Sequence, residues 1–180
     1  MEMPATEEGF LKLARYPLDF VMASIHIIDD WMFDHPDHRD KYLLYDNDEL
    51  YKKYFLKLAL LLEWEGYNII GHMDLIKVFG IKSDLNFKPL IQKGLQKLVN
   101  KNCAVELNTA GLFKPVQEIY PAPDLIEWLF SLNIPITISS DAHRPEDVGR
   151  ENALAIEMAK KAGYTKLAVF DKRKRYFINI

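Results

Sequence analysis

The stretch Ile134-Pro135-Ile136-Thr137-Ile138-Ser139-Ser140-Asp141-Ala142-His143 joins an apolar run to two polar residues that could bind a metal. The run is short and rich in β-branched residues, which is typical of a buried strand. Side chains two residues apart share a face of a strand, so we expect Asp141 and His143 to point the same way where the strand ends. A carboxylate and an imidazole placed together are suitable ligands for zinc or a harder divalent ion.

Segments that resemble strands alternate with segments of helical periodicity along the rest of the chain. The expected strands are residues 19–27, 68–72, 103–108, 134–140, 166–170 and 175–180, and the expected helices are residues 7–16, 48–65, 87–100, 124–132 and 150–162. This alternation predicts an α/β fold of parallel β–α units. Periodicity alone does not distinguish a barrel from an open doubly wound sheet. Residues 29–46 are expected to form a long polar loop, typical of functional or poorly ordered segments, in which His35 and His38 face solvent.

Polar residues occupy the carboxyl ends of the predicted strands, where the active sites of parallel α/β folds gather. They are His26, His72, Glu106, Asn108, Asp141 and His143. Any one histidine could be a hydrogen-bonded structural residue, and Asp141 could be a simple turn residue before a helix. Imidazoles at three strand ends on one rim nevertheless favour a metal site. Glu106 lies in an apolar strand, and a buried carboxylate needs a metal, an arginine or backbone donors as its partner.

Length, composition and charge narrow the class of protein. The 180 residues suit one domain, and 49% hydrophobic and 27% charged residues are ordinary for a soluble globular chain. A formal net charge of −3 gives no electrostatic case for a nucleic-acid or membrane partner, and the basic residues 172–175 are expected to form a solvated hairpin turn. The single cysteine, Cys103, excludes an intramolecular disulfide and is expected in the core. Without a signal-peptide pattern or an apolar run of membrane-spanning length, we expect a cytoplasmic protein.

Several motifs, taken in order, resemble those of the polymerase and histidinol phosphatase (PHP) superfamily. They are Ser24-Ile25-His26, Gly71-His72-Met73-Asp74, Glu106-Leu107-Asn108-Thr109-Ala110-Gly111 and Ser140-Asp141-Ala142-His143-Arg144-Pro145-Glu146-Asp147-Val148-Gly149. The sequences that flank these motifs are most similar to those of the histidinol-phosphatase branch. They are Ile28-Asp29-Asp30-Trp31, Lys114-Pro115-Val116-Gln117-Glu118-Ile119-Tyr120-Pro121 and the closing Arg173-Lys174-Arg175. The resemblance extends over essentially the whole chain.

The resemblance implies a distorted, TIM-like (β/α)7 barrel with one to three divalent ions, zinc, iron or manganese, at its carboxyl rim. Carried over onto this sequence, it implies metal ligands at Glu2, His26, His72, Asp141 and His143. Asp141 and His143 would also act in catalysis, and Glu106 and Asn108 would support the ligands. The family's opening His-x-His motif has no match here. We therefore expect a partial barrel of the PHP type, missing the first β–α units.

The resemblance further implies hydrolysis of a small phosphate monoester by a metal-activated water, in a single domain over residues 1–180. Phe113 stands where the branch tends to have arginine, so specificity for histidinol phosphate is less secure, and Lys114 and Arg144 are the cations expected to meet a phosphate. The alternative is a non-catalytic remnant or fragment that binds metal or a partner chain. A barrel without its opening strands exposes a strand edge, so we expect a homo-oligomer or uptake of a missing amino-terminal segment.

Overall fold

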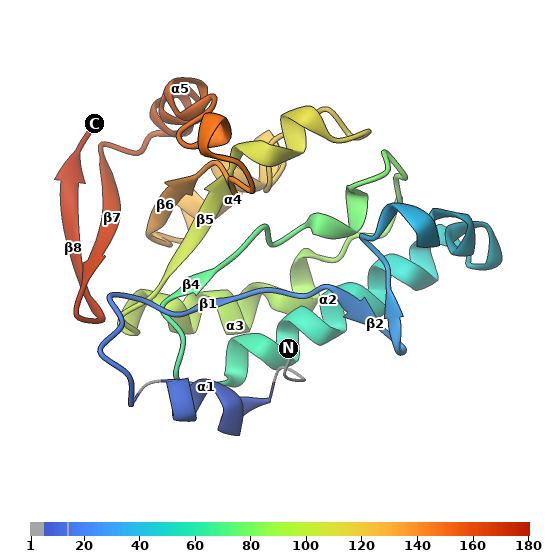
Figure 1. Ribbon diagram of the computed structural model, residues 1–180, viewed down its shortest axis with the longest axis horizontal. Coiled ribbons are helices and arrows are strands. Elements are labelled where there is room, and N and C mark those ends of the chain that lie inside the picture. The colour runs from blue at the N-terminus through green and yellow to red at the C-terminus, as the bar shows by residue number, and fades with distance from the viewer. Residues whose placement is uncertain (1–5, 14) are drawn as a thin grey trace.

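A parallel sheet forms the centre of the computed structural model, which describes residues 6–13 and 15–180. Its four strands are β1 (Met22–Ala23), β4 (Ile69–Ile70), β5 (Ala104–Asn108) and β6 (Ile136–Ser139), paired in the order β1-β4-β5-β6 (Figure 1). Every pairing is parallel, with Ala23 opposite Ile70, Ile70 opposite Val105 and Val105 opposite Ile136. The α/β class predicted from the sequence is confirmed, and the parallel sheet is consistent with the expected partial barrel.

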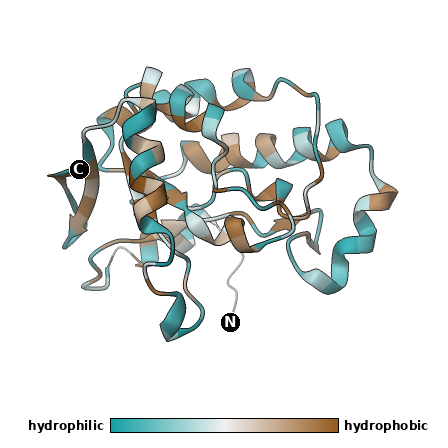
Figure 2. Ribbon diagram, turned by 90° about the horizontal axis from the view of Figure 1, so that it is seen from above, coloured by the Kyte–Doolittle hydropathy of each residue, from teal (hydrophilic) through white to brown (hydrophobic). Residues whose placement is uncertain are grey.

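Helices connect and cover these strands. They are α1 (Glu7–Leu13), α2 (Asn47–Glu63), α3 (Lys88–Asn100), α4 (Pro123–Ser131) and α5 (Asn152–Ala162). Hydrophilic and hydrophobic residues alternate around the helices, which is the pattern of amphipathic helices on a core (Figure 2). α2 packs with α3 over the larger apolar cluster, and α4 packs with α5 beside β6 over a smaller one. No helix in the described part of the chain is long and apolar enough to cross a membrane.

The helix limits follow local sequence signals. Asp46 caps α2, because its side chain accepts a hydrogen bond from the backbone N–H of Glu49 at 3.0 Å. Gly163 ends α5 in the left-handed conformation, with φ of 110°. The 3₁₀ turns η2 (Leu75–Lys77), η3 (Thr109–Phe113) and η4 (Pro145–Asp147) follow β4, β5 and β6 respectively. These turns place polar side chains just beyond the carboxyl ends of the strands.

The first predicted strand, residues 19–27, is much longer than the two residues that pair as β1. Val21, Ala23 and Ile25 are buried against the core, but Phe20 is 47% exposed on the other face. Among the described residues, β1 pairs with β4 on one side and with no strand on the other. Within the described residues, β1 is therefore an edge strand of this sheet. Its alternating pattern is typical of a strand, but only two of its residues pair in the ladder.

The predicted polar loop contains a tight hairpin instead of irregular chain. β2 (Ile27–Ile28) and β3 (Trp31–Met32) pair antiparallel, and the two turn residues, Asp29 and Asp30, have φ of 49° and 61°. Positive φ at both central residues is the signature of a type I′ turn, whose twist matches that of the strands it joins. The 3₁₀ turn η1 (Pro36–Leu44) completes the loop.

Of the basic cluster at residues 172–175, Lys172 and Arg173 form the turn of the hairpin made by β7 (Lys166–Asp171) and β8 (Lys174–Asn179), and the other two residues begin β8. A hairpin turn is expected here from the sequence, but the two arginines of the basic cluster are not simply solvated. Arg173 Nη2 donates to the carbonyl of Gly66 at 2.8 Å, and Arg175 Nη1 donates to the carbonyls of Lys101, at 3.0 Å, and Cys103. These carbonyls precede β4 and β5, so the hairpin fastens the amino ends of the sheet.

We expect Arg175→Met to lower the free energy of unfolding by about 1–3 kcal/mol, since two carbonyls lose a charged donor while the aliphatic packing remains. Urea denaturation measures the effect. The exposed neighbour Lys174 provides the matched control, and Lys174→Met should change stability by less than about 0.5 kcal/mol. Equal effects of the two substitutions would show that the carbonyl contacts are not what holds the hairpin.

Candidate active site

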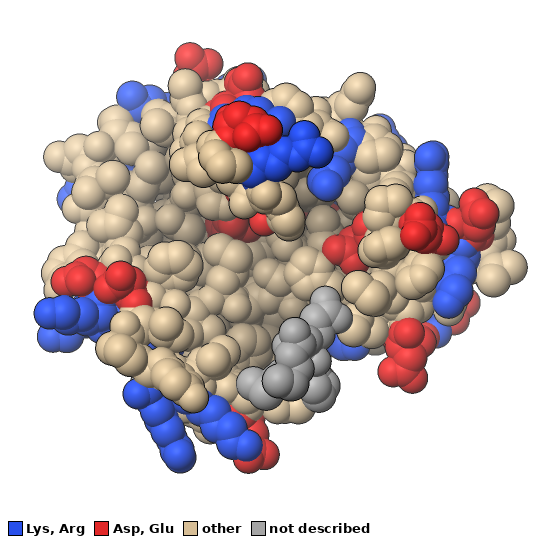
Figure 3. Space-filling model, viewed as in Figure 1, with Lys and Arg blue, Asp and Glu red and all other residues tan. Residues whose placement is uncertain are grey.

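A cavity of about 540 Å³ opens at the carboxyl ends of the parallel strands. Its polar lining comes from the segments that follow β1, β4, β5 and β6, and consists of Ser24, His26, Asp34, His72, Lys114, Tyr120, Asp141 and His143. Phe10, Leu75 and Val78 contribute apolar walls. In the orientation of Figure 1, the molecular surface is hollowed near its middle, with acidic side chains visible inside the hollow (Figure 3). The cavity therefore lies where parallel α/β folds place their sites.

His26 and His72 approach each other across this cavity. Their ring centroids are 5.0 Å apart at an interplanar angle of 80°. His72 is 6% exposed, and its Nδ1 is buried without a hydrogen-bond partner among the described residues. Burial lowers the pKa of the His72 ring, which favours the neutral imidazole that binds metals. A buried imidazole nitrogen without a protein partner is what a metal ligand would look like before its ion is bound.

Glu106 is the centre of a buried hydrogen-bond network at the same strand ends. The carboxylate is 1% exposed, and Oε2 accepts from the backbone N–H of His72 at 2.7 Å. Oε2 also accepts from Asn108 Nδ2 at 3.1 Å, and Oε1 accepts from Ser139 Oγ at 2.5 Å. The expectation that this carboxylate needs a partner is met by a backbone donor, an amide and a hydroxyl, which together hold the charge in the interior.

The network continues to Asp141, which lies just beyond the end of the next strand, β6. Asn108 Nδ2 donates to Asp141 Oδ2 at 3.2 Å, and the backbone N–H of Asp141 donates to Ser139 Oγ at 3.2 Å. The chain segment with His72 and the segment with Asp141 are thereby joined through Glu106, Asn108 and Ser139. Asp141 has φ of 48°, a left-handed conformation that costs energy for most non-glycine residues and that aspartate adopts more readily than most.

Asp141 and His143 both line the cavity, but the strand argument for their direction is wrong. β6 ends at Ser139, and the left-handed backbone of Asp141 breaks the two-residue alternation. His143 is exposed, and its Nδ1 lies 2.9 Å from the carbonyl oxygen of Asp141. The turn after the strand, rather than the strand itself, brings the two residues to one cavity.

The donors in the cavity fit a divalent cation in kind. Three imidazoles and two carboxylates line the cavity, and these are the side chains typical of zinc, iron or manganese sites; the Nδ1 of His72, unpartnered among the described residues, supports this assignment. Within residues 6–13 and 15–180, however, no three histidine, cysteine or carboxylate side chains already surround one point. Glu2, the remaining expected ligand, lies outside the described residues.

Of the two expected phosphate-binding cations, the structure brings one to the cavity. Lys114 is exposed and lines it, whereas Arg144 is exposed and does not belong to the lining. Phe113, at the position where the resemblance leads one to expect arginine, lies beneath another guanidinium, with Arg150 Cζ 3.4 Å from its ring centroid. That guanidinium is also paired with Asp147 at 2.7 Å.

Sequence reasoning missed two residues that line the cavity, Asp34 and Tyr120. Asp34 Oδ2 lies 2.7 Å from His26 Nδ1. Tyr120 is 1% exposed and has a buried hydroxyl without a partner among the described residues. Burial raises the pKa of Tyr120 above its ordinary value, which keeps the hydroxyl protonated. Neither residue is at a strand end, which was the signal that sequence reasoning used.

A buried lysine holds Tyr120 in place. Lys77 Nζ lies 2.9 Å from Asp74 Oδ2, donates to the carbonyl of Ile119 at 2.8 Å, and contacts Glu118 Oε1. The same ammonium is 5.4 Å from the centroid of the Tyr120 ring. Because Asp74 follows β4 and Glu118 follows β5, this ion cluster ties together the two loops that form one wall of the cavity.

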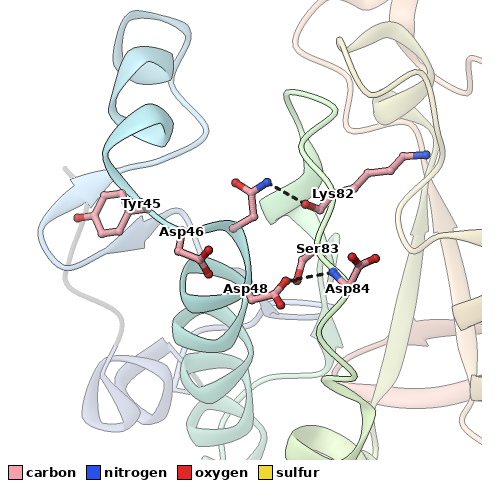
Figure 4. A pocket seen from close by; sticks show the side chains of 7 residues that line it. Tyr45, Asp46, Asp48, Lys82, Ser83 and Asp84 are labelled. Carbon is pink, nitrogen blue, oxygen red and sulfur yellow. Dashed lines mark hydrogen bonds between the residues drawn. The ribbon is translucent and has the colours of Figure 1, made fainter.

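A second cavity, of about 520 Å³, lies at the start of α2 and is lined by acidic residues (Figure 4). Two of its three carboxylates have structural partners. Asp46 caps the helix, and Asp48 Oδ1 accepts from Ser83 Oγ at 2.5 Å and from the backbone N–H of Asp84 at 3.0 Å. These contacts anchor residues 82–84 to α2.

Comparison with known proteins agrees with the geometry. The sequence matches the family model of the PHP domain over residues 3–110. It is 35% identical over 162 residues to a probable histidinol-phosphatase of Deinococcus radiodurans, covering 89% of this chain and 61% of that protein. It is 30% identical over 168 residues to the histidinol-phosphatase of Lactococcus lactis, covering 88% of this chain and 60% of that one. The chain thus spans about three-fifths of the length of these relatives.

Two solved structures share the fold. The crystal structure of the histidinol phosphate phosphatase of Lactococcus lactis, in complex with zinc, L-histidinol and phosphate, has a TM-score of 0.71 at 27% identity. The match covers 92% of this chain and 64% of that one. The putative histidinol phosphatase of Listeria monocytogenes has a TM-score of 0.67 at 20% identity, covering 82% and 63% of the two chains.

Proposed function

The chain belongs to the PHP domain family, in its histidinol-phosphatase-like branch, and from that premise we propose that it is a metal-dependent phosphoric monoester hydrolase. The proposed substrate is a small phosphate monoester of the histidinol phosphate kind, and the proposed unit is one domain over residues 1–180. The observation that supports the proposal most is the approach of the His26 and His72 rings, whose centroids are 5.0 Å apart, next to the hydrogen-bond network of Glu106. We further propose a cytoplasmic protein without a nucleic-acid or membrane partner.

We propose that His26, His72, Asp141 and His143, with Glu2, hold one to three divalent ions, zinc, iron or manganese. Bound metal ions would neutralise charge on the phosphate and acidify a water molecule. Glu106 and Asn108 keep the backbone of His72 and the carboxylate of Asp141 in register, which limits the movement of both ligands. Ligands held in this way lose little freedom when an ion binds.

The other residues of the cavity have roles that follow from their chemistry. Lys114 lines the cavity and supplies a cation for a phosphate oxygen. Arg144 is the second proposed cation for the phosphate, although it does not line the cavity. Of the two proposed catalytic residues that line the cavity, Asp141 or His143 would give a proton to the oxygen of the leaving alcohol. Leu75 and Val78 form an apolar wall for the organic part of the ester and exclude water from that side.

The alternative function is a non-catalytic PHP-like protein that binds metal or a partner chain. Two observations favour it: no three ligands surround one point among residues 6–13 and 15–180, and β1 has an unpaired edge within the described residues. In this alternative, the β1 edge binds a second copy of the chain or an amino-terminal segment of another one. Metal content and phosphatase activity separate the two functions.

The first test is metal content per chain, by mass spectrometry on protein purified without chelator or metal-affinity resin. We expect near-stoichiometric metal in the unaltered chain and its loss in the double variant His26→Ala, His72→Ala. The double variant His35→Ala, His38→Ala is the matched control, since these two rings are also adjacent, at 5.3 Å, but do not line the cavity. The control should retain its metal.

Hydrolysis of histidinol phosphate is then measured on the same three proteins. Activity that follows the metal content supports the phosphatase. Stoichiometric metal without activity on phosphate monoesters would favour the non-catalytic alternative. Absence of metal from the unaltered chain would contradict both the metal site and the hydrolase.

A further inference from the structure

The tight hairpin β2–β3 brings Asp34 back to His26 although eight residues separate them. Ile28 pairs with Trp31 and Ile27 with Met32, so the chain reverses over the two turn residues. Continuing this register places the residues just before β2 beside those just after β3. The distance between Asp34 Oδ2 and His26 Nδ1 is 2.7 Å.

Packing holds Asp34 in this position. Its neighbour Phe33 is 0% exposed and meets the Tyr54 ring of α2 edge-on, with centroids 5.6 Å apart. In α2, Lys53 Nζ lies 2.5 Å from Oδ2 of the turn residue Asp29, and Lys57 Nζ donates to the carbonyl of Ile27 at 2.8 Å. The hairpin is therefore fastened to α2 at three points, and the Asp34 carboxylate is presented by a fixed backbone.

We propose that Asp34 is the positioning residue for His26: its carboxylate accepts the Nδ1–H of the imidazole and assigns Nε2 as the nitrogen that coordinates a divalent ion. A ligating histidine commonly donates its other ring N–H to a carboxylate, which sets the tautomer and the ring orientation. Asp34 lines the same cavity as His26 and His72, and its side chain is 22% exposed. The inference rests on the proposed metal site and adds a residue that no strand-end pattern indicates.

The chain offers a matched control in the same loop. Asp37 lies 3.8 Å from His35 Nδ1, but its side chain is 86% exposed and does not line the cavity. Asp34→Ala and Asp37→Ala therefore remove the same carboxylate from two aspartate–histidine pairs, only one of which belongs to the proposed site. Asp34→Asn is a conservative variant, because the amide oxygen can still accept the Nδ1–H while the shape is kept.

Two measurements on the 180-residue chain test the proposal. Zinc affinity is measured by competition with a chromogenic chelator, and the His26 tautomer by long-range proton–nitrogen NMR on metal-free protein, assigned with His26→Ala. We expect Asp34→Ala to weaken zinc binding about 10–100-fold and to lower the population of the Nδ1–H tautomer of His26, because the carboxylate that stabilises this tautomer is lost. Asp34→Asn should keep the tautomer and lose less than about 10-fold in affinity. Asp37→Ala should change neither quantity.

The outcomes separate this inference from the proposed function. If Asp34→Ala weakens zinc binding without changing the tautomer, Asp34 acts other than through His26 and the positioning role is overturned. If zinc binding and the tautomer are both unchanged, the metal site stands and only the role of Asp34 is wrong. If the unaltered chain binds no zinc, manganese or iron, the proposed metal site fails, and the role of Asp34 fails with it.

Discussion

Glu106→Leu is expected to lower the free energy of unfolding by more than about 3 kcal/mol, because it removes the acceptor of two buried donors and one partly buried donor. The donors are the backbone N–H of His72, the amide of Asn108 and the hydroxyl of Ser139. Each buried polar group left unpaired costs about 1–3 kcal/mol, and a domain of this size has only about 5–15 kcal/mol in all. Urea denaturation followed by circular dichroism measures the loss.

Glu106→Gln tests the contribution of the hydrogen bonds separately from that of the negative charge. The amide keeps the shape and one acceptor oxygen, so we expect a smaller loss than for leucine, with the parallel sheet intact. Metal content should fall in both variants, since the positions of His72 and Asp141 depend on the same carboxylate. A loss below about 1 kcal/mol for leucine would show that water or neighbouring groups satisfy the three donors, and that Glu106 does not organise the strand ends.

Gly111→Ala is expected to have the second large effect, destabilising the chain by about 1–3 kcal/mol or more and closing one wall of the cavity. A Cβ at this position would lie 2.1 Å from the carbonyl oxygen of Glu118 and 2.7 Å from Tyr120 Cε2. The first of these contacts is with backbone, so the segment of Glu118 and Tyr120 must move. Stability is measured by thermal unfolding, and the site by zinc affinity and phosphatase activity.

Gly9→Ala is the matched control for this substitution. Gly9 lies in α1, and a Cβ there would have Thr6 Oγ1 as its nearest neighbour at 3.4 Å, an ordinary contact. Alanine is the better helix former, so we expect no loss of stability and a gain of up to about 1 kcal/mol. If Gly111→Ala is tolerated as well as the control, the loop that holds Tyr120 is more adaptable than its contacts with Lys77 indicate.

The sequence by itself determined the class of the fold and the rim on which the polar residues gather. Helices such as α2 and α5 were predicted within a few residues, because apolar spacing within one element reports which face meets the core. Strand ends were marked by the change from β-branched residues to Glu106, Asn108 and Asp141, and parallel strands bring such ends to one edge. These are local signals combined with one rule of topology.

Only the tertiary structure decided how these residues work together. Asp34 reaches His26 because a two-residue turn reverses the chain and Phe33 is buried against α2, and neither condition is visible in a periodic pattern. Glu106 has partners from three different strand ends, so its network exists only after the sheet has assembled. Arg175 looks like a solvated turn residue in the sequence, yet it donates to carbonyls more than seventy positions away. Contacts between distant segments depend on the packing of the whole chain, which no single segment encodes.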